Sequence, residues 1–362
     1  MRIALINDQP LYSGMGKYAF NLFERLKNKY SLDLLFLNYQ GRALETHNGE
    51  IVTRGTKFPI FDNKPFFWFR MRKKFPDYDI YHFTNQNLSF LIFQKNTIIT
   101  CHDVAPLIIS DNPAEKILRH YLYQGLKKAS LIIADSFSTK RDLIRIYSIP
   151  GENIHVVYLG VENTIFKPLD DKIEIRKRLG LPPDKKLIIN VGTEKRRKNI
   201  EGLLCAFSYL AKEYKDTVLL RIGKQKKSTK GLISKLGLQN NVLYYEDVKE
   251  ENLPFFYNAA DLFVMPSYYE GFGLPAIEAM SCGIPVIVAN TSSFPEIVDD
   301  AGVKVNPSSI IEIYDKMKKV LEEPNLREEL KEKGIQQAKK FSWHKTVVET
   351  EEIYSKFVLD FK

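Results

Sequence analysis

The stretch that decides the fold is Pro266–Asn290, whose sequence is PSYYEGFGLPAIEAMSCGIPVIVAN. It follows a short apolar run, Ala260–Met265, and ends in a second run, Ile284–Ala289. Apolar runs of this length are typical of strands that are buried on both faces of a parallel sheet. Between them, Pro275 suits the first turn of a helix and Gly283 suits its end. The stretch therefore predicts a strand–loop–helix–strand unit with parallel strands.

The loop of this unit, Tyr268–Gly273, is predicted to line a binding site. In open parallel sheets, ligands bind beyond the carboxyl ends of the strands, and this loop lies at such an end. Gly271 and Gly273 allow the backbone to approach a ligand closely. The amides of Gly273 and Leu274 at the helix start favour a phosphate, because the helix itself offers them no partner.

Two acids, Glu270 in the loop and Glu278 in the helix, narrow the class of ligand. Carboxylates repel phosphates, so we expect neutral hydroxyl groups as their partners, and each can accept two hydrogen bonds from a vicinal diol. A ligand with phosphates in the middle and a polyol at each end satisfies both features, and a nucleotide-sugar has this chemistry. The plain alternative is two solvated acids near a helix start, where acids are favoured anyway.

The segment that carries both acids, EGFGLPAIEAM, resembles the signature of glycosyltransferase family 4, whose members are retaining enzymes with the two-domain GT-B fold. The resemblance implies that Glu278 holds the ribose hydroxyls of the donor and that Glu270 holds the transferred sugar. It also implies that the sugar and the diphosphate contact the backbone of Gly271, Phe272, Gly273 and Leu274. From the residues alone, a glycoside hydrolase that uses Glu270 and Glu278 as acid and nucleophile is an alternative.

Composition sets the frame for these motifs. The chain has 362 residues, 44% of them hydrophobic, which suits two domains. No apolar run is long enough to span a bilayer and the N-terminus lacks the apolar core of a signal peptide, so we expect a cytoplasmic protein. Cys101, Cys205 and Cys282 are too few and too far apart for a disulfide framework or a cysteine metal site. The net charge of +9 favours anionic partners.

Strands and helices alternate along both halves of the chain, which predicts an α/β protein. With the resemblance, we expect the GT-B fold: two doubly wound Rossmann-like domains facing across a cleft. Residues 1–165 form the expected N-terminal, acceptor-side domain, and residues 170–342 form the expected C-terminal, nucleotide-sugar-binding domain. By the same resemblance, the last helix, about 343–362, crosses back to the first domain.

A glycine loop follows the first predicted strand, Arg2–Asp8, and an amphipathic helix is expected after it, from about Lys17 to Lys29. Gly14 and Gly16, together with Ala19, satisfy the dinucleotide-binding fingerprint, so an NAD(P)- or FAD-dependent oxidoreductase is an alternative. That fingerprint expects an acid at the end of the second strand, where Asn38 stands instead. The segment SGMGKYA also resembles the glycine loop of family 4, which implies that Gly14 and Gly16 approach the donor diphosphate.

The strand Thr97–His102 brings His102 to its carboxyl end, where the ligand is expected. A histidine there can donate a hydrogen bond to a sugar hydroxyl or stabilise a developing charge, or it can simply cap the strand. The stretch CHDVAP resembles the His-Asp-x-x-Pro stretch of family 4, which implies that His102 lies beside the donor sugar. His82 lacks such support and is interpreted as structural.

Two features of the first half suggest a function but are better explained by a structural role. Residues 58–75 combine aromatic and basic side chains, and we favour a core-facing helix over a contact with an anionic membrane. The triplet Asp77-Tyr78-Asp79 looks like the metal motif of the other large glycosyltransferase fold. It precedes the strand Ile80–Thr84, however, at the wrong end for the ligand crevice. We therefore expect no metal requirement.

The basic cluster Arg196–Lys198 follows a buried strand, and Asn199 is placed to cap the next helix. A diphosphate is the anion expected here, because arginine offers a fork and lysine a point charge, and a solvated basic turn is the alternative. The Arg-Lys pair of family 4 matches Arg197 and Lys198. Gly192-Thr193 resembles several mannosyltransferase-like members, which favours GDP-mannose over a UDP-sugar as the donor.

Taken together, these features predict a retaining, metal-independent hexosyltransferase of polysaccharide biosynthesis that needs no cofactor. It moves a mannose- or glucose-type sugar from a nucleotide-diphosphate donor to a glycan or lipid-linked acceptor, with His102 and Glu270 as catalytic residues. By resemblance, the leaving phosphate takes the proton of the acceptor. Nucleic acid is the least favoured partner, because no nucleic-acid-binding signature is present. A nucleotide-binding protein without catalysis is a further alternative.

Overall fold

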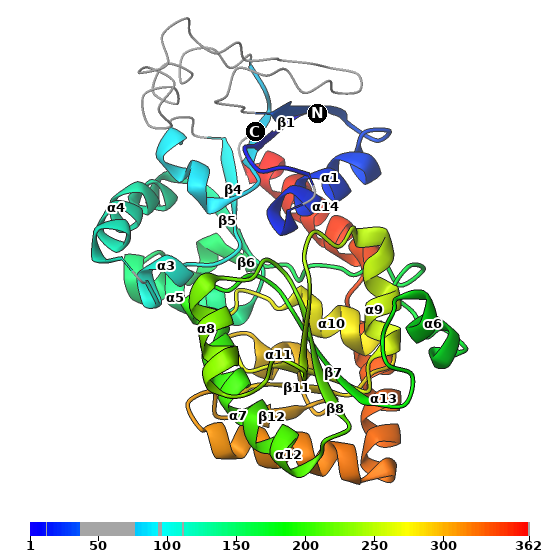
Figure 1. The fold of residues 1–362 in the computed structure, drawn as a ribbon. Helices are drawn as coiled ribbons and strands as arrows, with labels where there is room; N and C mark the ends of the chain where they lie inside the picture. The colour runs from blue at the N-terminus through cyan, green and yellow to red at the C-terminus, as the bar shows by residue number, and fades with distance from the viewer. Residues whose placement is uncertain (12, 37–76, 93–95, 111, 361–362) are drawn as a thin grey trace, which may run out of the picture. The chain divides into compact units, whose positions relative to one another are not determined.

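The computed structural model describes residues 1–11, 13–36, 77–92, 96–110 and 112–360, and the chain divides into two compact units (Figure 1). The first unit comprises Met1–Ile108, Asn112–Leu159 and Trp343–Lys362, and the second comprises Ile109–Asp111 and Gly160–Ser342. The sequence analysis placed the division between residues 165 and 170 and the return of the chain at about 343. The stretch 58–75 and Asn38 lie outside the described residues.

The first unit is built on a parallel sheet with the strand order β2-β1-β3-β4-β5-β6. The chain leaves β1 for β2 on one side and leaves β3 for β4 on the other, so the strand order reverses between β1 and β3. Such a switch point is where open sheets bind ligands. The strands are β1 (Arg2–Asn7), β2 (Ser31–Phe36), β3 (Ile80–Phe83), β4 (Thr97–Cys101), β5 (Leu131–Ala134) and β6 (Ile154–Val156).

The second unit repeats this plan with the order β12-β11-β10-β7-β8-β9, again with parallel neighbours. Its switch point lies between β7 and β10, because β7 leads to β8 on one side and β10 leads to β11 on the other. The strands are β7 (Lys186–Val191), β8 (Thr217–Ile222), β9 (Val242–Tyr245), β10 (Leu262–Met265), β11 (Val286–Ala289) and β12 (Val303–Val305). The prediction of two doubly wound α/β halves is confirmed.

The decisive stretch folds as predicted. β10 and β11 pair in parallel, with Phe263 opposite Val286, and every residue of both strands is buried. The connecting helix α10 (Leu274–Ser281) carries Pro275 in its first turn. Gly283 follows its end with a φ of 72°, a left-handed conformation that costs glycine little and that ends many helices.

Helices and short 3₁₀ turns connect the strands. Among the described residues of the first unit they are α1 (Gly14–Leu26), η2 (Gln86–Leu91), α3 (Ala105–Ile108), α4 (Pro113–Tyr123), η3 (Gln124–Lys128), α5 (Phe137–Tyr147), η4 (Gly151–Asn153) and α14 (Trp343–Asp360). In the second they are α6 (Lys172–Arg178), η5 (Arg196–Lys198), α7 (Ile200–Glu213), α8 (Lys227–Lys235), η6 (Glu250–Asn252), α9 (Leu253–Ala259), α10, α11 (Phe294–Val298), α12 (Ile310–Glu322) and α13 (Pro324–Ala338).

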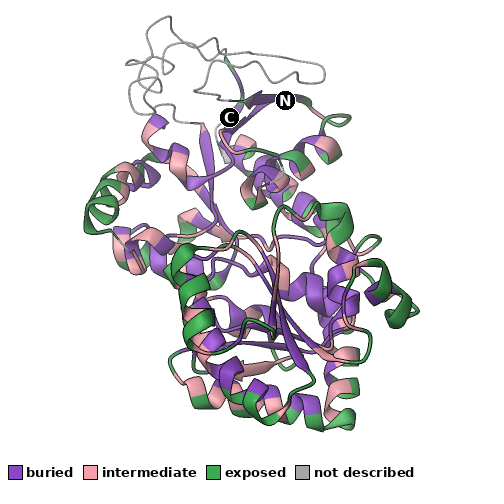
Figure 2. Ribbon diagram, in the orientation of Figure 1, coloured by how far each residue is buried: buried purple, intermediate pink, exposed green. Residues whose placement is uncertain are grey.

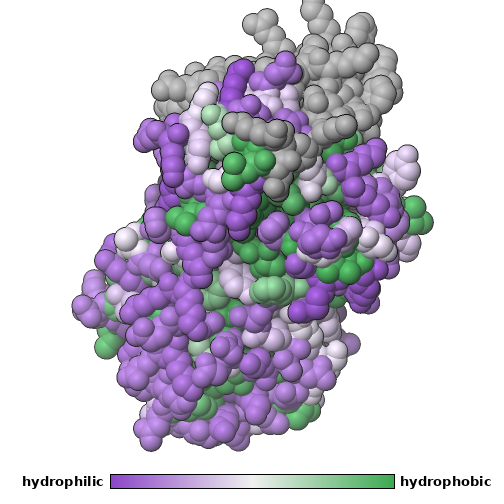
Figure 3. Space-filling model, turned by 180° about the vertical axis from the view of Figure 1, so that it is seen from behind, coloured by the Kyte–Doolittle hydropathy of each residue, from purple (hydrophilic) through white to green (hydrophobic). Residues whose placement is uncertain are grey.

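The burial pattern follows from this layout. Figure 2 shows the inner strands of both sheets in purple and the outer faces of α4, α6 and α8 in green, so the sheets form the buried layers. The edge strands β6, β9 and β12 are only partly buried. From behind, the second unit presents mainly hydrophilic residues (Figure 3). Its core includes Ile188 and Leu219 of the sheet and Leu203 and Phe207 of α7, all fully buried.

The helix α1 begins earlier than predicted, at Gly14 rather than at about Lys17. The side chain of Ser13 accepts a hydrogen bond from the amide of Gly16 at 3.1 Å, and this cap starts the helix there. Gly14 and Gly16 therefore lie in the first helical turn and not in a loop. A Cβ on Gly16 would lie 2.0 Å from the carbonyl oxygen of Pro10, whereas a Cβ on Gly14 meets nothing within 4 Å.

The last helix, α14, belongs to the first unit and packs against α1. Thr346 of α14 donates a hydrogen bond to the carbonyl oxygen of Tyr158 at 2.8 Å. Further along, the hydroxyl of Tyr354 lies 2.5 Å from Nδ1 of His82 in β3. These buried contacts fix the end of the described chain against the first sheet.

The two glycines of α1 give a matched pair of variants. Gly16→Ala is expected to destabilise the protein by roughly 1–3 kcal/mol, because the helix start and the Pro10 backbone must move apart. Gly14→Ala is expected to leave stability unchanged or raise it by up to about 1 kcal/mol, because alanine favours a helix over glycine. Thermal and urea unfolding of both variants measures the difference. Equal losses would contradict the packing described for Gly16.

Candidate active site

Three charged side chains meet at the switch point of the second unit. The turn η5, which follows β7, carries Arg197 and Lys198, and the loop after β10 carries Glu270. Arg197 Nη1 lies 3.0 Å from Oε2 of Glu270, and Lys198 Nζ lies 2.7 Å from Oε1 and 2.8 Å from Oε2. β7 and β10 are neighbours in the sheet. The sheet therefore brings Glu270 together with Arg197 and Lys198, although 73 and 72 positions separate them in the sequence.

Glu270 is buried, with 4% of the residue exposed. Burial alone would raise its pKa, but the positive charges of Lys198 and Arg197 outweigh burial and hold the pKa of Glu270 below its usual value. Glu270 is therefore an ionised carboxylate at neutral pH. Two basic side chains share this one carboxylate, so the cluster is suited to accept an anion in place of one of its contacts.

Serines after β11 hold the loop that carries Glu270. The hydroxyl of Ser292 accepts a hydrogen bond from the amide of Glu270 at 2.9 Å. The hydroxyl of Ser293 lies 3.1 Å from the carbonyl oxygen of Glu270 and 2.8 Å from that of Phe272, and it can donate to either. The sequence analysis did not assign these roles, and the only signal was a pair of serines at the carboxyl end of an apolar strand.

The start of α10 lies directly after this loop. Gly273 caps the helix with a φ of 103°, and its cap has no side-chain hydrogen bond. A Cβ on Gly273 would also lie 2.7 Å from the ring of Phe294, so glycine is required there for two reasons. The helix start therefore has no side-chain cap, and its backbone polarity favours anions. The predicted backbone contacts at Gly271, Phe272, Gly273 and Leu274 stay a prediction.

Glu278 lies one turn further along α10 and is also buried. Its Oε2 accepts a hydrogen bond from the hydroxyl of Tyr257 in α9 at 2.7 Å. Burial raises the pKa of Tyr257 well above its usual value, and the neighbouring Glu278 adds to this effect, so Tyr257 is the donor. The predicted ribose contact of Glu278 stays a prediction, and Tyr257 is the partner that orients its carboxylate.

A second buried acid, Glu194, was missed by the sequence analysis. It follows β7 and accepts hydrogen bonds from the amide of Lys226 at 2.7 Å, from Thr229 at 2.6 Å and from the hydroxyl of Tyr244 at 2.8 Å. These contacts tie the β7 loop to α8 and β9. Both carboxylate oxygens of Glu194 accept hydrogen bonds from the protein, so we interpret it as a support of the loop that carries Arg197.

In the first unit, His102 directly follows β4 and is 7% exposed. Its Nδ1 lies 2.6 Å from Oδ2 of Asp135, and its Nε2 lies 2.9 Å from the carbonyl oxygen of Thr84. Both partners are acceptors, so a doubly protonated ring satisfies both. Burial alone would lower the pKa of His102, but the carboxylate of Asp135 outweighs burial and raises it.

These contacts bear on the predicted role of His102. Both ring nitrogens are used inside the protein, so a contact with a sugar requires Nε2–H to leave the carbonyl oxygen of Thr84. The contact with the donor sugar stays a prediction. Asp135 was missed, because nothing in the sequence of β5 distinguishes an acid that pairs with a neighbouring strand end from any acid before a helix.

His82 lies in β3 of the same unit and is fully buried. Its Nε2 lies 2.8 Å from the hydroxyl of Thr100, which lies 2.8 Å from the hydroxyl of Tyr18. Burial lowers the pKa of His82 to about 3, and the charge of His102 adds to this effect. A neutral histidine that links α14 to β4 and α1 matches the structural interpretation of His82.

The triplet Asp77-Tyr78-Asp79 lies at the amino end of β3, as predicted. The carboxylate of Asp79 accepts a hydrogen bond from the amide of Arg2 at 2.7 Å, and Tyr78 donates to Asp33 at 2.7 Å. Within the described ranges, no group of three or more His, Cys, Asp or Glu side chains is placed to hold a metal ion. The lack of a metal requirement stays a prediction.

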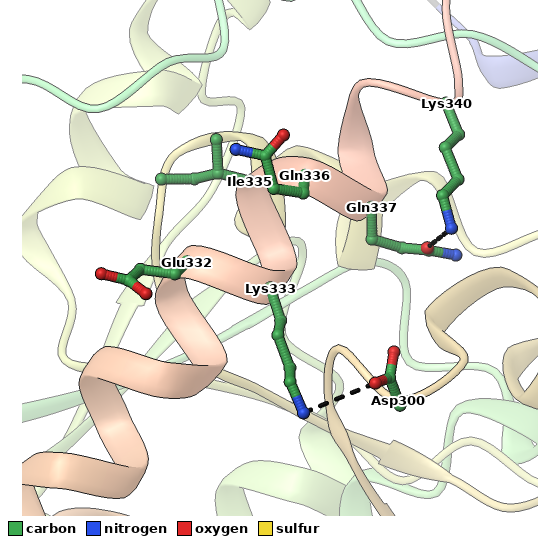
Figure 4. A pocket seen from close by; sticks show the side chains of 7 residues that line it. All are labelled: Asp300, Glu332, Lys333, Ile335, Gln336, Gln337 and Lys340. Atoms are coloured by element: carbon green, nitrogen blue, oxygen red, sulfur yellow. Dashed lines mark hydrogen bonds and ion pairs between the residues drawn. The ribbon is translucent and has the colours of Figure 1, made fainter.

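A cavity of about 580 Å³ in the second unit is lined by none of the predicted site residues (Figure 4). It lies along α13, where Lys333 pairs with Asp300 at 3.4 Å and Lys340 donates to Gln337 at 2.6 Å.

Of the helices that the structure describes, none combines the length and the apolar character that a bilayer span requires.

Comparisons with known proteins agree with this geometry. The family model described as "Glycosyltransferase Family 4" matches residues 12–164, and the model "Glycosyl transferases group 1" matches residues 171–337. The chain is 31% identical to O-antigen chain mannosyltransferase B of Escherichia coli, over 94% of this chain and 96% of that protein.

Two solved structures show the fold. Sucrose-phosphate synthase from Thermosynechococcus elongatus has a TM-score of 0.83 at 23% identity and covers 99% of each chain. HepE of Anabaena, in complex with UDP-glucose, has a TM-score of 0.81 at 18% identity and covers 98% of this chain and 100% of its own. The predicted GT-B fold of two Rossmann-like domains is confirmed. The near full-length relative and the two family models together place this chain in glycosyltransferase family 4, to which it belongs.

Proposed function

We propose that this glycosyltransferase is a retaining, metal-independent mannosyltransferase of polysaccharide biosynthesis, with GDP-mannose as its donor and a glycan or lipid-linked acceptor. The observation that carries the proposal is the cluster of Arg197, Lys198 and Glu270 at a switch point, beside the start of α10. The similarity to an O-antigen chain mannosyltransferase and the pair Gly192-Thr193 support mannose over glucose. The matches to glycosyltransferase models favour neither the oxidoreductase nor the hydrolase alternative.

The cluster can bind a nucleotide-sugar by exchanging partners. A diphosphate carries acceptor oxygens for the guanidinium of Arg197 and the ammonium of Lys198, so it replaces the carboxylate of Glu270 as their counterion. The amides at the start of α10 add donors on the other side. Glu270, once released, accepts hydrogen bonds from the sugar hydroxyls. The same side chains then stabilise the charge that develops on the departing diphosphate.

The acceptor reaction follows from this arrangement. The bond between the anomeric carbon and the diphosphate oxygen breaks, and the acceptor hydroxyl forms a new bond on the same face of the sugar. The acceptor proton passes to the leaving phosphate, so no protein nucleophile is assigned. Glu278, oriented by Tyr257, holds the ribose hydroxyls, and the contacts with Asp135 and the carbonyl oxygen of Thr84 fix the ring of His102 in the first unit.

The donor is tested by a screen of nucleotide-sugars. Selective binding raises the melting temperature, so GDP-mannose is expected to stabilise the protein more than UDP-glucose or NAD at the same concentration. With GDP-mannose and a mannan fragment, nuclear magnetic resonance of the product is expected to show an α-mannosidic bond. A β bond would contradict retention, and a larger shift with NAD would contradict the proposed class of ligand.

The phosphate contact is tested with two lysines of the same loop. Lys198→Ala is expected to weaken GDP binding by about tenfold to hundredfold, because it removes a charge-assisted hydrogen bond. Lys195→Ala is the matched control, since Lys195 is exposed and is expected to change affinity by less than about threefold. Isothermal titration calorimetry measures both.

In the same experiment, Glu270→Gln is expected to bind GDP at least as tightly as the natural protein, because the two basic side chains no longer need to leave a carboxylate. Its transfer rate is expected to fall by at least about a hundredfold. Equal losses of GDP affinity in Lys195→Ala and Lys198→Ala would contradict the assignment of Lys198. A strong loss of GDP affinity in Glu270→Gln would contradict the exchange of partners.

A further inference from the structure

The strand β8 carries an arginine inside the second sheet. All six residues of β8 are buried, and Arg221 has no exposed surface. Buried strands of parallel sheets are normally apolar, and a buried charge costs free energy unless hydrogen bonds replace its solvation. Strand burial therefore does not explain Arg221, and the groups that it contacts become informative.

Arg221 holds the carboxyl end of the neighbouring strand β7. Its Nη1 donates to the carbonyl oxygen of Asn190 at 3.0 Å and to Oδ1 of the same residue. Its Nη2 donates to the carbonyl oxygen of Gly192 at 2.9 Å. Asn190 in turn donates to the carbonyl oxygen of Val264 in β10 at 2.6 Å. One guanidinium group thus ties β8 to β7, and through Asn190 to β10, at the switch point of this sheet.

Gly192 connects Arg221 with the candidate active site. Its φ of 134° is a conformation that other residues rarely adopt. A Cβ on Gly223 would lie 2.3 Å from the carbonyl oxygen of Gly192, so the end of β8 packs directly against that carbonyl group. A Cβ on Gly192 would lie 3.9 Å from both Cε and Nζ of Lys198. The end of the Lys198 side chain therefore lies against a residue whose carbonyl group is held by Arg221.

A second contact couples Arg221 to Glu194, which supports the same loop. The guanidinium carbon of Arg221 lies 5.7 Å from the ring centre of Tyr244, and the hydroxyl of Tyr244 donates to Glu194 at 2.8 Å. Burial lowers the pKa of Arg221, and Tyr244 and Glu194 oppose this effect. The loop after β7 is therefore held at Gly192 and again at Glu194, just before it reaches Lys198.

Two simpler roles explain Arg221 less well. A direct contact with a ligand does not fit, because the residue is fully buried and both Nη groups donate to the loop and strand end beside it. A contribution to stability alone is also a poor explanation, since apolar residues of similar volume at buried charged positions are often equally stable or more so.

We propose that Arg221 is a positioning residue of the transfer reaction, which holds the carbonyl groups of Asn190 and Gly192 and thereby fixes the loop that presents Lys198 to the donor diphosphate. The inference rests on the proposed role of Lys198 as a diphosphate contact. Electrostatic catalysis requires charges that are in place before the ligand arrives, and small displacements of them lower the rate. Lysine at position 221 would be a poor substitute, because its single ammonium group lacks the fork that spans both carbonyl groups.

The first test makes the same substitution at two buried arginines of the second unit. Arg176 in α6 is 5% exposed and donates to the carbonyl oxygens of Ala259 and Lys185, which precede β10 and β7, so it holds the opposite ends of these strands. Arg221→Lys is expected to weaken GDP binding by about tenfold and to lower kcat with GDP-mannose by at least about the same factor. Arg176→Lys is expected to change both by less than about twofold. Isothermal titration calorimetry and product assays measure these effects.

Thermal unfolding accompanies these measurements. Both lysine variants are expected to lower the melting temperature by a few degrees, because each loses part of a buried hydrogen-bond network. Arg221→Met repeats the binding measurement with a neutral side chain that needs no solvation, and it is expected to weaken GDP binding at least as much as Arg221→Lys. Unchanged GDP affinity in both variants of Arg221, or an equal loss in Arg176→Lys, would overturn the proposal.

The route through Lys198 is tested by a double-mutant cycle. In the Lys198→Ala background, Arg221→Lys is expected to change GDP affinity by less than about twofold, because the group that it positions is gone. The same tenfold loss in both backgrounds would overturn the proposal. If Lys198→Ala weakens GDP binding while Arg221→Lys does not, the inference fails and the proposed diphosphate contact stands. If Lys198→Ala leaves GDP affinity unchanged, the diphosphate contact fails and the inference fails with it.

Discussion

The contact of Glu270 with Arg197 and Lys198 is the interaction on which the site of the second unit depends. A buried carboxylate has lost its water and stays charged only where cations or hydrogen-bond donors replace that solvation. Removing one partner of a buried ion pair costs about 3–5 kcal/mol, because the remaining charge is left uncompensated. The loops after β7 and β10 are therefore held together until another group takes over one of these contacts.

This constraint links the fold to the proposed chemistry. The parallel order of the sheet places two loops from distant parts of the sequence at one switch point, and serines after β11 and Glu194 after β7 hold them there. A diphosphate is an anion that can take over the basic side chains, and a sugar offers the hydroxyls that a released carboxylate needs. The resting contact thus keeps the charged groups ordered, and preorganised charges are what electrostatic catalysis requires.

The sequence predicts the units of this fold well, because strand burial and helix ends are local properties. β10, α10 and β11 follow from apolar runs, Pro275 and Gly283, and the meeting of Lys198 with Glu270 follows from strand order. The start of α1 was predicted three residues too late. The two glycines indicated a loop, whereas the side chain of Ser13 caps the helix and starts it at Gly14. Asp135 and Glu194 were missed, because their roles depend on partners from other strands, which periodicity does not reveal.

The central claim is most directly tested by a crystal structure of the protein with bound GDP-mannose. The account predicts that Lys198 Nζ moves to within about 3 Å of a diphosphate oxygen and that the carboxylate of Glu270 accepts hydrogen bonds from the mannose hydroxyls. It would be contradicted by a complex in which Lys198 remains paired with Glu270 while the diphosphate lies away from both η5 and the start of α10.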